Sequence, residues 1–350
     1  MAHLFPSPST LRFQGLDVSK ATFDVAWWGD QPPLRMTNHR YPRSPAGVAA
    51  WLAQIPASEF PLMGVVMTLD PRQRMRWRGE STGGYCKELA GWILAACPGL
   101  HVSIANPFMV KAYGRSIGNR NKTDRVDARV LARFGQERQP GAWVPLSAHQ
   151  EALRDLTRLR TKLKSTRTAY RNRLKGPGIA SPVARQVQEE LIAHLEGQIK
   201  AVEKAIQALC EQDPGLKRDL ELLRSIDGIG LITAATVLGA VGDLRAFHRR
   251  GALCAFLGVS PRQFQSGTSV HGKTHLCRIG SKHARAALYM AAVAACRLKG
   301  PLGDYYRRLV AAGKPKKSAL GALMRKLLVV MRAVLIQGTP YQAPSSPACA

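Results

Sequence analysis

The chain has 350 residues, 45% of them hydrophobic, and carries 51 Lys and Arg against 23 Asp and Glu, a net charge of +28. This length and composition exclude a disordered tail and allow two or three folded domains. So strong a positive charge, spread along the chain, predicts a polyanionic partner, with nucleic acid ahead of an anionic membrane surface. No apolar run reaches the roughly 18 residues that cross a bilayer, and residues 1–10 lack the features of a signal peptide, so we expect no membrane partner.

The seven cysteines are odd in number, widely spaced and without a CxxC pair. This pattern indicates neither a disulfide framework nor a zinc site, and it favours a reducing compartment. We therefore expect a cytoplasmic protein that acts on nucleic acid.

Residues 11–28 (LRFQGLDVSKATFDVAWW) predict two antiparallel strands joined by a tight turn. Asp17 lies inside the first strand, where a carboxylate is costly unless something binds it. Asp24, in the second strand, is open to a plainer interpretation as a hydrogen-bonded turn residue. A strand-borne Asp followed by a small hydroxyl residue and a hairpin is also how ribonuclease H-like nucleases begin their metal site.

The next segments alternate between helix and strand. We predict a helix over 46–55, a buried strand over 61–67 and, after the basic interruption 68–79, a helix that Glu80 opens and that runs to about residue 97. Glu80 is placed where a carboxylate could join a metal cluster, and Gly83 and Gly84 behind it allow close backbone approach. A further strand over 101–105 completes an α/β pattern.

Residues 111–122 carry four basic side chains between glycine and serine residues. We expect a mobile loop that contacts phosphates, with Arg115, Arg120 and Lys122 as candidate nucleic-acid ligands.

A helix is predicted from Thr123 onward, because Thr123 can cap it and Val126, Val130 and Phe134 form an apolar face. Asp124 and Asp127 then share one side of its first turn. Two such carboxylates stay ionised with nearby cations or a bound divalent metal. The plainer alternative is that both favour the helix N-terminus and pair with neighbouring basic residues, and this remains open. Those neighbours are Arg120, Lys122, Arg125 and Arg129.

Two long amphipathic helices follow, over 151–175 and 186–210. The first carries nine Lys or Arg against two acids, and the second repeats apolar residues at spacings of three and four, as a heptad seam does. The pair predicts an antiparallel coiled-coil arm. It either packs on its own domain or joins two subunits, and the basic face favours contact with nucleic acid.

Residues 222–241 (LLRSIDGIGLITAATVLGAV) predict a helix-hairpin-helix in which the amides near Gly228 and Gly230 meet a phosphate, although such glycine turns are also commonly structural. After a short helix over 245–257, residues 258–273 predict a loop centred on Ser266 and flanked by the basic residues Arg262 and Lys273. Closing helices are expected over 281–297 and 318–335.

Taken together, these segments resemble the DEDD transposases of insertion-sequence family one-ten, which are RNA-guided recombinases of bacterial mobile elements. The resemblance covers about residues 11–337, and its most specific parts are NKTDRVDA and QSGTSVHGK. One departure concerns Glu80: in the family this acid usually follows its strand at once, whereas here twelve residues intervene, with Asp70 as a minor rival among them. The motifs that carry the resemblance are GLDVSK, ESTGGY, NKTDRVDA, SIDGIG and LGVSPRQFQSGTSVHGK.

The resemblance implies a RuvC-like (ribonuclease H-like) α/β domain over 10–146, a coiled-coil arm over 147–212 and a mostly helical transposase domain over 213–338, before a disordered tail over 339–350. It implies Mg²⁺ as cofactor, with donor and target DNA, a structured guide RNA and a homo-oligomer, at least a dimer, as partners. Its site residues are the metal ligands Asp17, Glu80, Asp124 and Asp127, and the nucleophile Ser266.

Two alternatives remain. A metal-dependent junction-resolving nuclease of the RuvC type would need only the four acids and water, and it would leave no covalent protein–DNA adduct. A non-catalytic nucleic-acid-binding protein would use the charge and the helix-hairpin-helix, and it would tolerate replacement of any of the acids.

Overall fold

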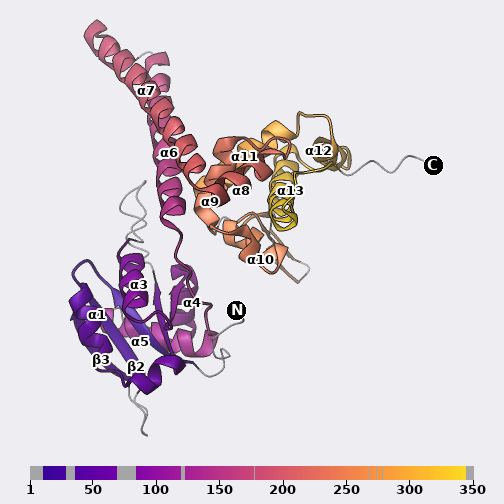
Figure 1. Ribbon diagram of the computed structural model, residues 1–350. Coiled ribbons are helices and arrows are strands. Elements are labelled where there is room, and N and C mark those ends of the chain that lie inside the picture. The colour runs from indigo at the N-terminus through magenta and orange to yellow at the C-terminus, as the bar shows by residue number, and fades with distance from the viewer. Residues whose placement is uncertain are drawn as a thin grey trace. The chain divides into compact units, whose positions relative to one another are not determined.

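The computed structural model describes residues 11–28, 36–68, 84–119, 123–176, 178–267, 269–272, 274–277 and 279–343. The chain divides into two compact units, Met1–Pro145 and Leu146–Ala350, which we describe separately (Figure 1).

The N-terminal unit is built on one five-stranded sheet with the order β3-β2-β1-β4-β5. Strands β1, β2 and β3 form an antiparallel meander, and β4 and β5 run parallel to β1. The strands are β1 (Arg12–Val18), β2 (Thr22–Trp28), β3 (Met36–Pro42), β4 (Met63–Thr68) and β5 (His101–Ala105).

Helices cover both faces of this sheet, and the alternation of side chains along β1 separates the two layers. Leu16 and Val18 join the core under α1 and α3, around the fully buried Trp51. Leu11 and Phe13 join the opposite core, under α4 and α5. The helices of this unit are α1 (Pro45–Leu52), the short 3-10 helix η2 (Ala57–Leu62), α3 (Gly84–Ala96), α4 (Pro107–Ser116) and α5 (Asp124–Arg138).

The C-terminal unit is mostly helical and has a single large core. Its helices are α6 (Ala148–Lys175), α7 (Pro182–Gln212), α8 (Pro214–Arg224), α9 (Leu231–Val241), η3 (Leu244–Ala246), α10 (Arg250–Leu257), α11 (Lys282–Ala295), α12 (Pro301–Ala311) and α13 (Lys316–Gln337). Four two-residue strands lie between α10 and α11: β6 (Pro261–Arg262), β7 (Gln265–Ser266), β8 (Val270–His271) and β9 (His275–Leu276). The expectation of an α/β N-terminal part and a mostly helical C-terminal part is confirmed.

Helices α6 and α7 lie side by side as a long hairpin (Figure 1). The heptad-like seam of α7 faces inward: Ile199 is 5% exposed, Ile206 is fully buried, and Val202 and Cys210 enter the core of the unit. The seam is thus used within the chain. Apolar side chains nearer the start of α7, Val183 and Val187, are exposed.

Several elements differ from the sequence-based expectation. The sequence did not predict strand β3 or helix α12, and α4 covers residues 111–116, half of the segment 111–122 that was expected to be a loop. Residues 258–273 contain short antiparallel ribbons, not only loop. Residues 339–343, assigned above to a disordered tail, are held against the unit, since the backbone N–H of Tyr341 donates to Ser225 Oγ at 2.7 Å; residues 344–350 lie outside the described chain.

Within the described residues, no helix is both long enough and apolar enough to span a membrane.

Candidate active site

Helix α5 packs so closely on the sheet that backbone meets backbone. A Cβ atom on Gly15 of β1 would lie 2.1 Å from the carbonyl oxygen of Ala128 and 2.2 Å from the amide nitrogen of Ala132. Ala26 of β2 completes this patch of small residues with Ala128 and Ala132. Only residues without large side chains permit this approach, so the sequence fixes the distance between α5 and β1.

The contacts further along β1 give the direction of α5. Gly135, near the end of the helix, packs on Phe13, and the backbone N–H of Phe13 donates to Gln136 Oε1 at 3.2 Å. Since Gly15 meets Ala128 and Phe13 meets Gly135, the helix runs antiparallel to β1. Its first turn, with the predicted Asp124 and Asp127, therefore lies toward the end of β1 that carries Asp17.

Asp17 belongs to the sheet face covered by α5, because it stands two and four residues from Gly15 and Phe13. In the register of β1 with β2 it is directly opposite Asp24. Asp24 is 2% exposed and lies within a strand, so its interpretation as a turn residue was wrong. Two carboxylates directly opposite each other on one face repel, and a nearby cation must compensate them.

Arg40 of β3 is the cation that binds Asp24. It stands opposite Asp24 in the β2–β3 register, and its Nε donates to Asp24 Oδ1 and Oδ2 at 3.1 and 3.0 Å. Its Nη2 lies 2.9 Å from Asp24 Oδ2 and donates to Asp124 Oδ2 at 3.2 Å. The hydrogen bonds to Asp24 and the charges of Asp24, Asp124 and Asp17 raise the pKa of the Arg40 guanidinium. Arg40 thus links the sheet to the first turn of α5.

The start of α5 is capped as the sequence predicted. Thr123 Oγ1 accepts a hydrogen bond from Val126 N at 3.3 Å, which satisfies one of the free amides of the first turn. Asn38 of β3 fastens the same end of the helix: its Nδ2 donates to the carbonyl of Arg125 at 3.1 Å, and its Oδ1 accepts from Arg129 Nε at 2.6 Å. The first turn is therefore held to the sheet by its own cap and by a strand that the sequence had not revealed.

The expected partners of the two helix acids are only partly those observed. Asp124, with 60% of its side chain exposed, pairs with Arg40, a residue far away in the sequence, and Arg129 binds Asn38. Asp127 is half-buried, one turn further into the helix. Arg120, Lys122 and Glu80 lie outside the described residues.

Asp17 on β1 and the first turn of α5, which carries Asp124 and Asp127, thus lie toward the same end of that strand. Within the described chain, which omits Glu80, no three His, Cys, Asp or Glu side chains form a metal-binding group. The donors nevertheless suit a hard divalent cation such as Mg²⁺, because all are carboxylate oxygens and the charges of Asp17, Asp24 and Asp124 already act together on one guanidinium.

Ser266 lies on an antiparallel ribbon in the C-terminal unit. It pairs with Val270, Gln265 pairs with His271, and the turn begins at Gly267, whose φ of +55° suits glycine. Gln265, Ser266 and Gly267 are all exposed. The ribbon continues through a hydrogen bond of 2.8 Å from Gly272 N to the carbonyl of Phe264, an exposed aromatic residue two positions before Ser266.

The base of this ribbon is anchored in the helical core. A Cβ atom on Gly258 would lie 2.4 Å from the carbonyl of Ile279, Val259 is fully buried, and Leu276 packs against the core. Ser266 is therefore exposed to solvent on a narrow two-stranded ribbon whose base packs on the helical core.

The candidate nucleic-acid ligands fall in different settings. Arg115 is exposed on α4, which corrects its expected position in a mobile loop, and Arg262 is exposed on β6. Lys273 lies outside the described residues.

The two glycines of the helix-hairpin-helix segment differ. A Cβ atom added to Gly228 would lie 2.9 Å from both Ala291 O and Ala295 N of α11, so this glycine is needed for packing. Gly230 is exposed and caps α9 without a side-chain hydrogen bond, which leaves the first amides of α9 as the phosphate-binding candidates.

Sequence reasoning missed Arg40 and Asn38 and undervalued Asp24. The signal available was MTNHRYP at 36–42, in which Asn38, Arg40 and Pro42 alternate with Thr37, His39 and Tyr41. This alternation is that of a strand, but its polar composition resembles a loop.

Two family models match parts of this chain. Residues 14–176 match the model of a DEDD transposase family of IS110 type, described as "Transposase", and residues 220–307 match the model described as "Transposase IS116/IS110/IS902 family". The chain is similar to the pilin gene-inverting protein of Moraxella bovis, with 34% identity over 263 residues, which cover 75% of this chain and 80% of that protein.

Two further relatives cover less of the chain. The transposase for insertion sequence element IS1111A of Coxiella burnetii is 27% identical over 206 residues, or 48% of this chain and 52% of that protein. An uncharacterized 43.6 kDa protein of insertion element IS110 from Streptomyces coelicolor is 34% identical over 168 residues, or 48% of this chain and 40% of that protein.

Proposed function

Because the chain belongs to the IS110 family of transposases and is therefore a DNA-rearranging enzyme, we propose that it cuts and rejoins DNA with a metal-binding carboxylate cluster and a serine nucleophile. The observation that carries this proposal is the placement of the first turn of α5 at the Asp17 end of β1. The strand order β3-β2-β1-β4-β5, with an antiparallel meander beside two parallel strands, supports a RuvC-like fold for this unit.

The cluster consists of Asp17, Asp124 and Asp127, with Glu80 as the fourth ligand. Their carboxylates would hold Mg²⁺, which when bound polarises the phosphodiester under attack. Strand β1 carries Asp17, and the first turn of α5 carries Asp124 and Asp127. Asp124→Ala and Asp127→Ala should each abolish strand cleavage while DNA binding persists.

Ser266 is the proposed nucleophile. A bond forms between its Oγ and the DNA phosphorus, the bond from phosphorus to a sugar oxygen breaks, and the serine proton is passed to that leaving oxygen. The product is a phosphoserine and a free sugar hydroxyl, so the bond energy is kept and rejoining needs no ATP. The ribbon supports this role, since Ser266 and its neighbours Gln265 and Gly267 are exposed.

A covalent adduct tests the nucleophile. Wild-type protein and the Ser266→Ala, Ser269→Ala and Ser260→Ala variants are incubated with end-labelled DNA, co-purified RNA and Mg²⁺, denatured, and resolved on a gel. We expect the adduct in all but Ser266→Ala. An adduct in Ser266→Ala, together with its loss in one of the control variants, would move the nucleophile. Cleavage without adduct in wild type would favour a junction-resolving nuclease that uses water.

The relative named as a pilin gene-inverting protein supports the proposal that this chain recombines two DNA sites. We propose that base pairing to a guide RNA selects these sites, while the protein supplies basic channels, as in other guided systems. Sequencing of RNA that co-purifies with the protein tests this directly, because a guided recombinase must retain one structured RNA species and random cellular RNA would contradict it.

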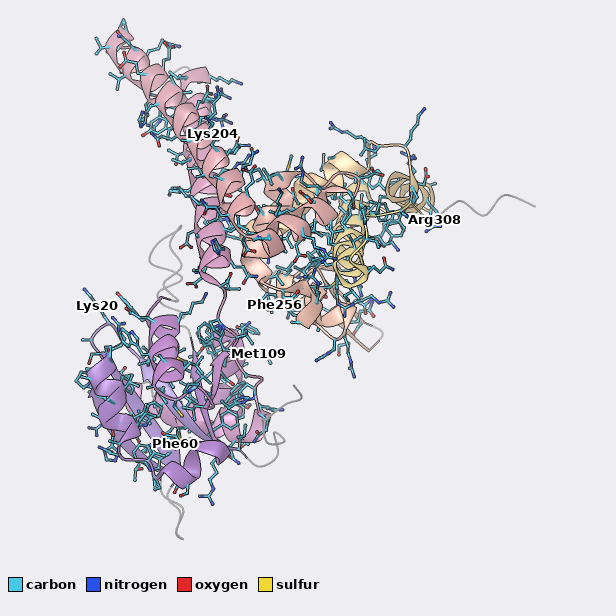
Figure 2. The ribbon with its side chains drawn as sticks, viewed as in Figure 1. Lys20, Phe60, Met109, Lys204, Phe256 and Arg308 are labelled. Atoms are coloured by element: carbon cyan, nitrogen blue, oxygen red, sulfur yellow. The ribbon has the colours of Figure 1, made fainter. Side chains whose placement is uncertain are left out.

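We attribute the affinity of the protein for DNA to its net charge of +28. Some of the basic residues that contribute to this charge lie on the long hairpin of α6 and α7. Lys204, for example, projects from α7 (Figure 2). Affinity for DNA should then fall steeply and linearly on a logarithmic scale as salt rises, because each phosphate contact releases counterions. A flat salt response would contradict the electrostatic assignment.

We also propose that the helical hairpin mediates self-association. Charges at Ile199 and Ile206 should unfold the chain, because both side chains are buried within it. The exposed Val183 and Val187 are the better positions: Val183→Glu with Val187→Glu should yield monomers of unchanged stability in light scattering. An unchanged assembly would exclude this part of the hairpin from the subunit interface.

A further inference from the structure

Arg40 is the feature of the cluster that the family comparison does not explain. It lies on the edge strand β3 and contacts two carboxylates, one on the neighbouring strand and one at the start of α5. The inference drawn from it rests on the proposed metal-binding function of the cluster.

The two contacts of Arg40 are unequal. Asp24 is buried, with 3% of its side chain exposed, and both of its oxygens receive hydrogen bonds from the guanidinium. Asp124 is 60% exposed and receives one hydrogen bond of 3.2 Å. Breaking the first contact would leave a buried carboxylate uncompensated, whereas breaking the second would release two groups that water can reach. The contact with Asp124 is therefore the exchangeable one.

We propose that Arg40 is the intrinsic counter-ion of the carboxylate cluster, and that a bound divalent cation replaces it at Asp124 while Arg40 stays on Asp24. Arg40 is in this account a positioning residue. When no metal is present, its single positive charge offsets part of the repulsion between Asp17 and Asp24, and it competes with the metal for Asp124.

The geometry predicts the direction of the competition. The position of α5 does not depend on Arg40, because the backbone contacts at Gly15 and the two hydrogen bonds of Asn38 hold the helix to the sheet. Removing the guanidinium should thus remove a repulsive positive charge from the metal site and leave its ligands in place. Divalent cations should bind more tightly, by about 3- to 10-fold for one charge removed at a partly solvated site.

The test is calorimetric titration of the full chain with Mn²⁺ and with Mg²⁺, paired with thermal unfolding. Arg40→Gln should bind either cation about 3- to 10-fold more tightly than wild type, melt at a lower temperature without metal, and gain more stability from metal. Arg133→Gln is the matched control, because Arg133 is on α5, similarly exposed at 48%, and also paired with a carboxylate, Glu137. Its metal affinity should remain that of wild type.

Two further variants separate the outcomes. Asp24→Asn with Arg40→Gln replaces the buried ion pair by two amides, so it should restore metal-free stability if Arg40→Gln folds poorly, and it still lacks the competitor at Asp124. Asp124→Asn should lose most of the cation binding, which assigns the measured heat to this cluster.

Each result decides between two claims. Unchanged or weaker cation binding in folded Arg40→Gln, with binding intact in wild type, would overturn the competition and leave the metal site standing. No binding in either protein would overturn the metal assignment itself. If Arg133→Gln raised the cation affinity as much as Arg40→Gln does, the effect would come from the overall charge of the protein and not from Arg40. This result would also overturn the inference.

Discussion

The carboxylate cluster and the Ser266 ribbon are held in opposite ways. The cluster lies on a sheet so close to α5 that a Cβ added to Gly15 would be 2.1 Å from the helix backbone. Two side chains of one strand, Asn38 and Arg40 of β3, also bind the start of this helix. At the ribbon tip, a Cβ added to Gly267 would meet no atom within 4 Å, and Ser266 is exposed.

This difference matches the two chemical roles that we propose. Metal ligands must be fixed relative to one another, since a hard cation requires several oxygens at once. A nucleophile must instead reach a phosphate that arrives from solvent. An exposed ribbon whose base is anchored in the helical core permits this approach. Substitutions should therefore affect stability strongly at the cluster and weakly at the ribbon, while both can remove activity.

The largest effect is expected for Gly15→Val. Its side chain would overlap the backbone of α5 at Ala128 and Ala132, and α5 would have to leave the sheet. We expect a loss of about 3 kcal/mol or more in the free energy of unfolding, measured by urea denaturation, and loss of DNA cleavage.

Gly91→Ala provides the control, because this exposed glycine on α3 has no atom within 4 Å of the added Cβ. It should stabilise the chain slightly, by up to about 1 kcal/mol. Equal stability of Gly15→Val and wild type would show that α5 is not held as described.

An intermediate effect is expected for Asn38→Ala, which removes the two hydrogen bonds that this side chain makes with the first turns of α5. The expected loss is about 1–2 kcal/mol in the free energy of unfolding, with faster hydrogen exchange at the start of α5. Asn172→Ala, at an exposed position of α6, is the control and should change neither quantity. Faster exchange throughout α5, and not only at its start, would contradict a local anchor.

The smallest effect on stability is expected for Gly267→Ala. The residue has φ of +55°, so a side chain costs about 1 kcal/mol, but it meets open space. The melting temperature should change little, whereas the rate of adduct formation by the neighbouring Ser266 should fall. A stability loss as large as that of Gly15→Val would remove the contrast between the two regions.

How much of this the sequence could predict depends on how local each determinant is. Thr123 as the cap of α5, Asp17 in β1 and the strand over 101–105 follow from patterns within a few residues, and the structure confirms all three. The position of α5 on β1 depends on Gly15 and Ala128, which are far apart in the sequence, and no periodicity pairs them.

Strand β3 and helix α4 were missed for different reasons. Strand β3 is an edge strand whose polar side chains bind α5 and not a hydrophobic core, so it lacks the apolar alternation of a strand. For α4, the glycine and serine residues of 111–122 indicated a loop, although Asn106 caps a helix by accepting from Phe108 N and Pro107 occupies its first turn. The same two residues end one element and begin the next.

The heptad-like pattern of α7 shows a further limit. Spacings of three and four identify the buried stripe of the helix correctly, since Leu195, Ile199 and Ile206 are buried. They do not say which helix covers that stripe, and here α6 and the helical core do so.

The most direct test of the account is whether the cluster and the ribbon act in one chemical step. Asp127→Ala, which retains Ser266, is incubated with labelled DNA, co-purified RNA and Mg²⁺, and covalent protein–DNA adduct is quantified beside wild type and Ser266→Ala. Binding of DNA by all three proteins is verified by gel shift. The account predicts that Asp127→Ala forms no adduct, as Ser266→Ala does not. A wild-type level of adduct in Asp127→Ala would show that Ser266 reacts without the carboxylates, and would contradict the central claim.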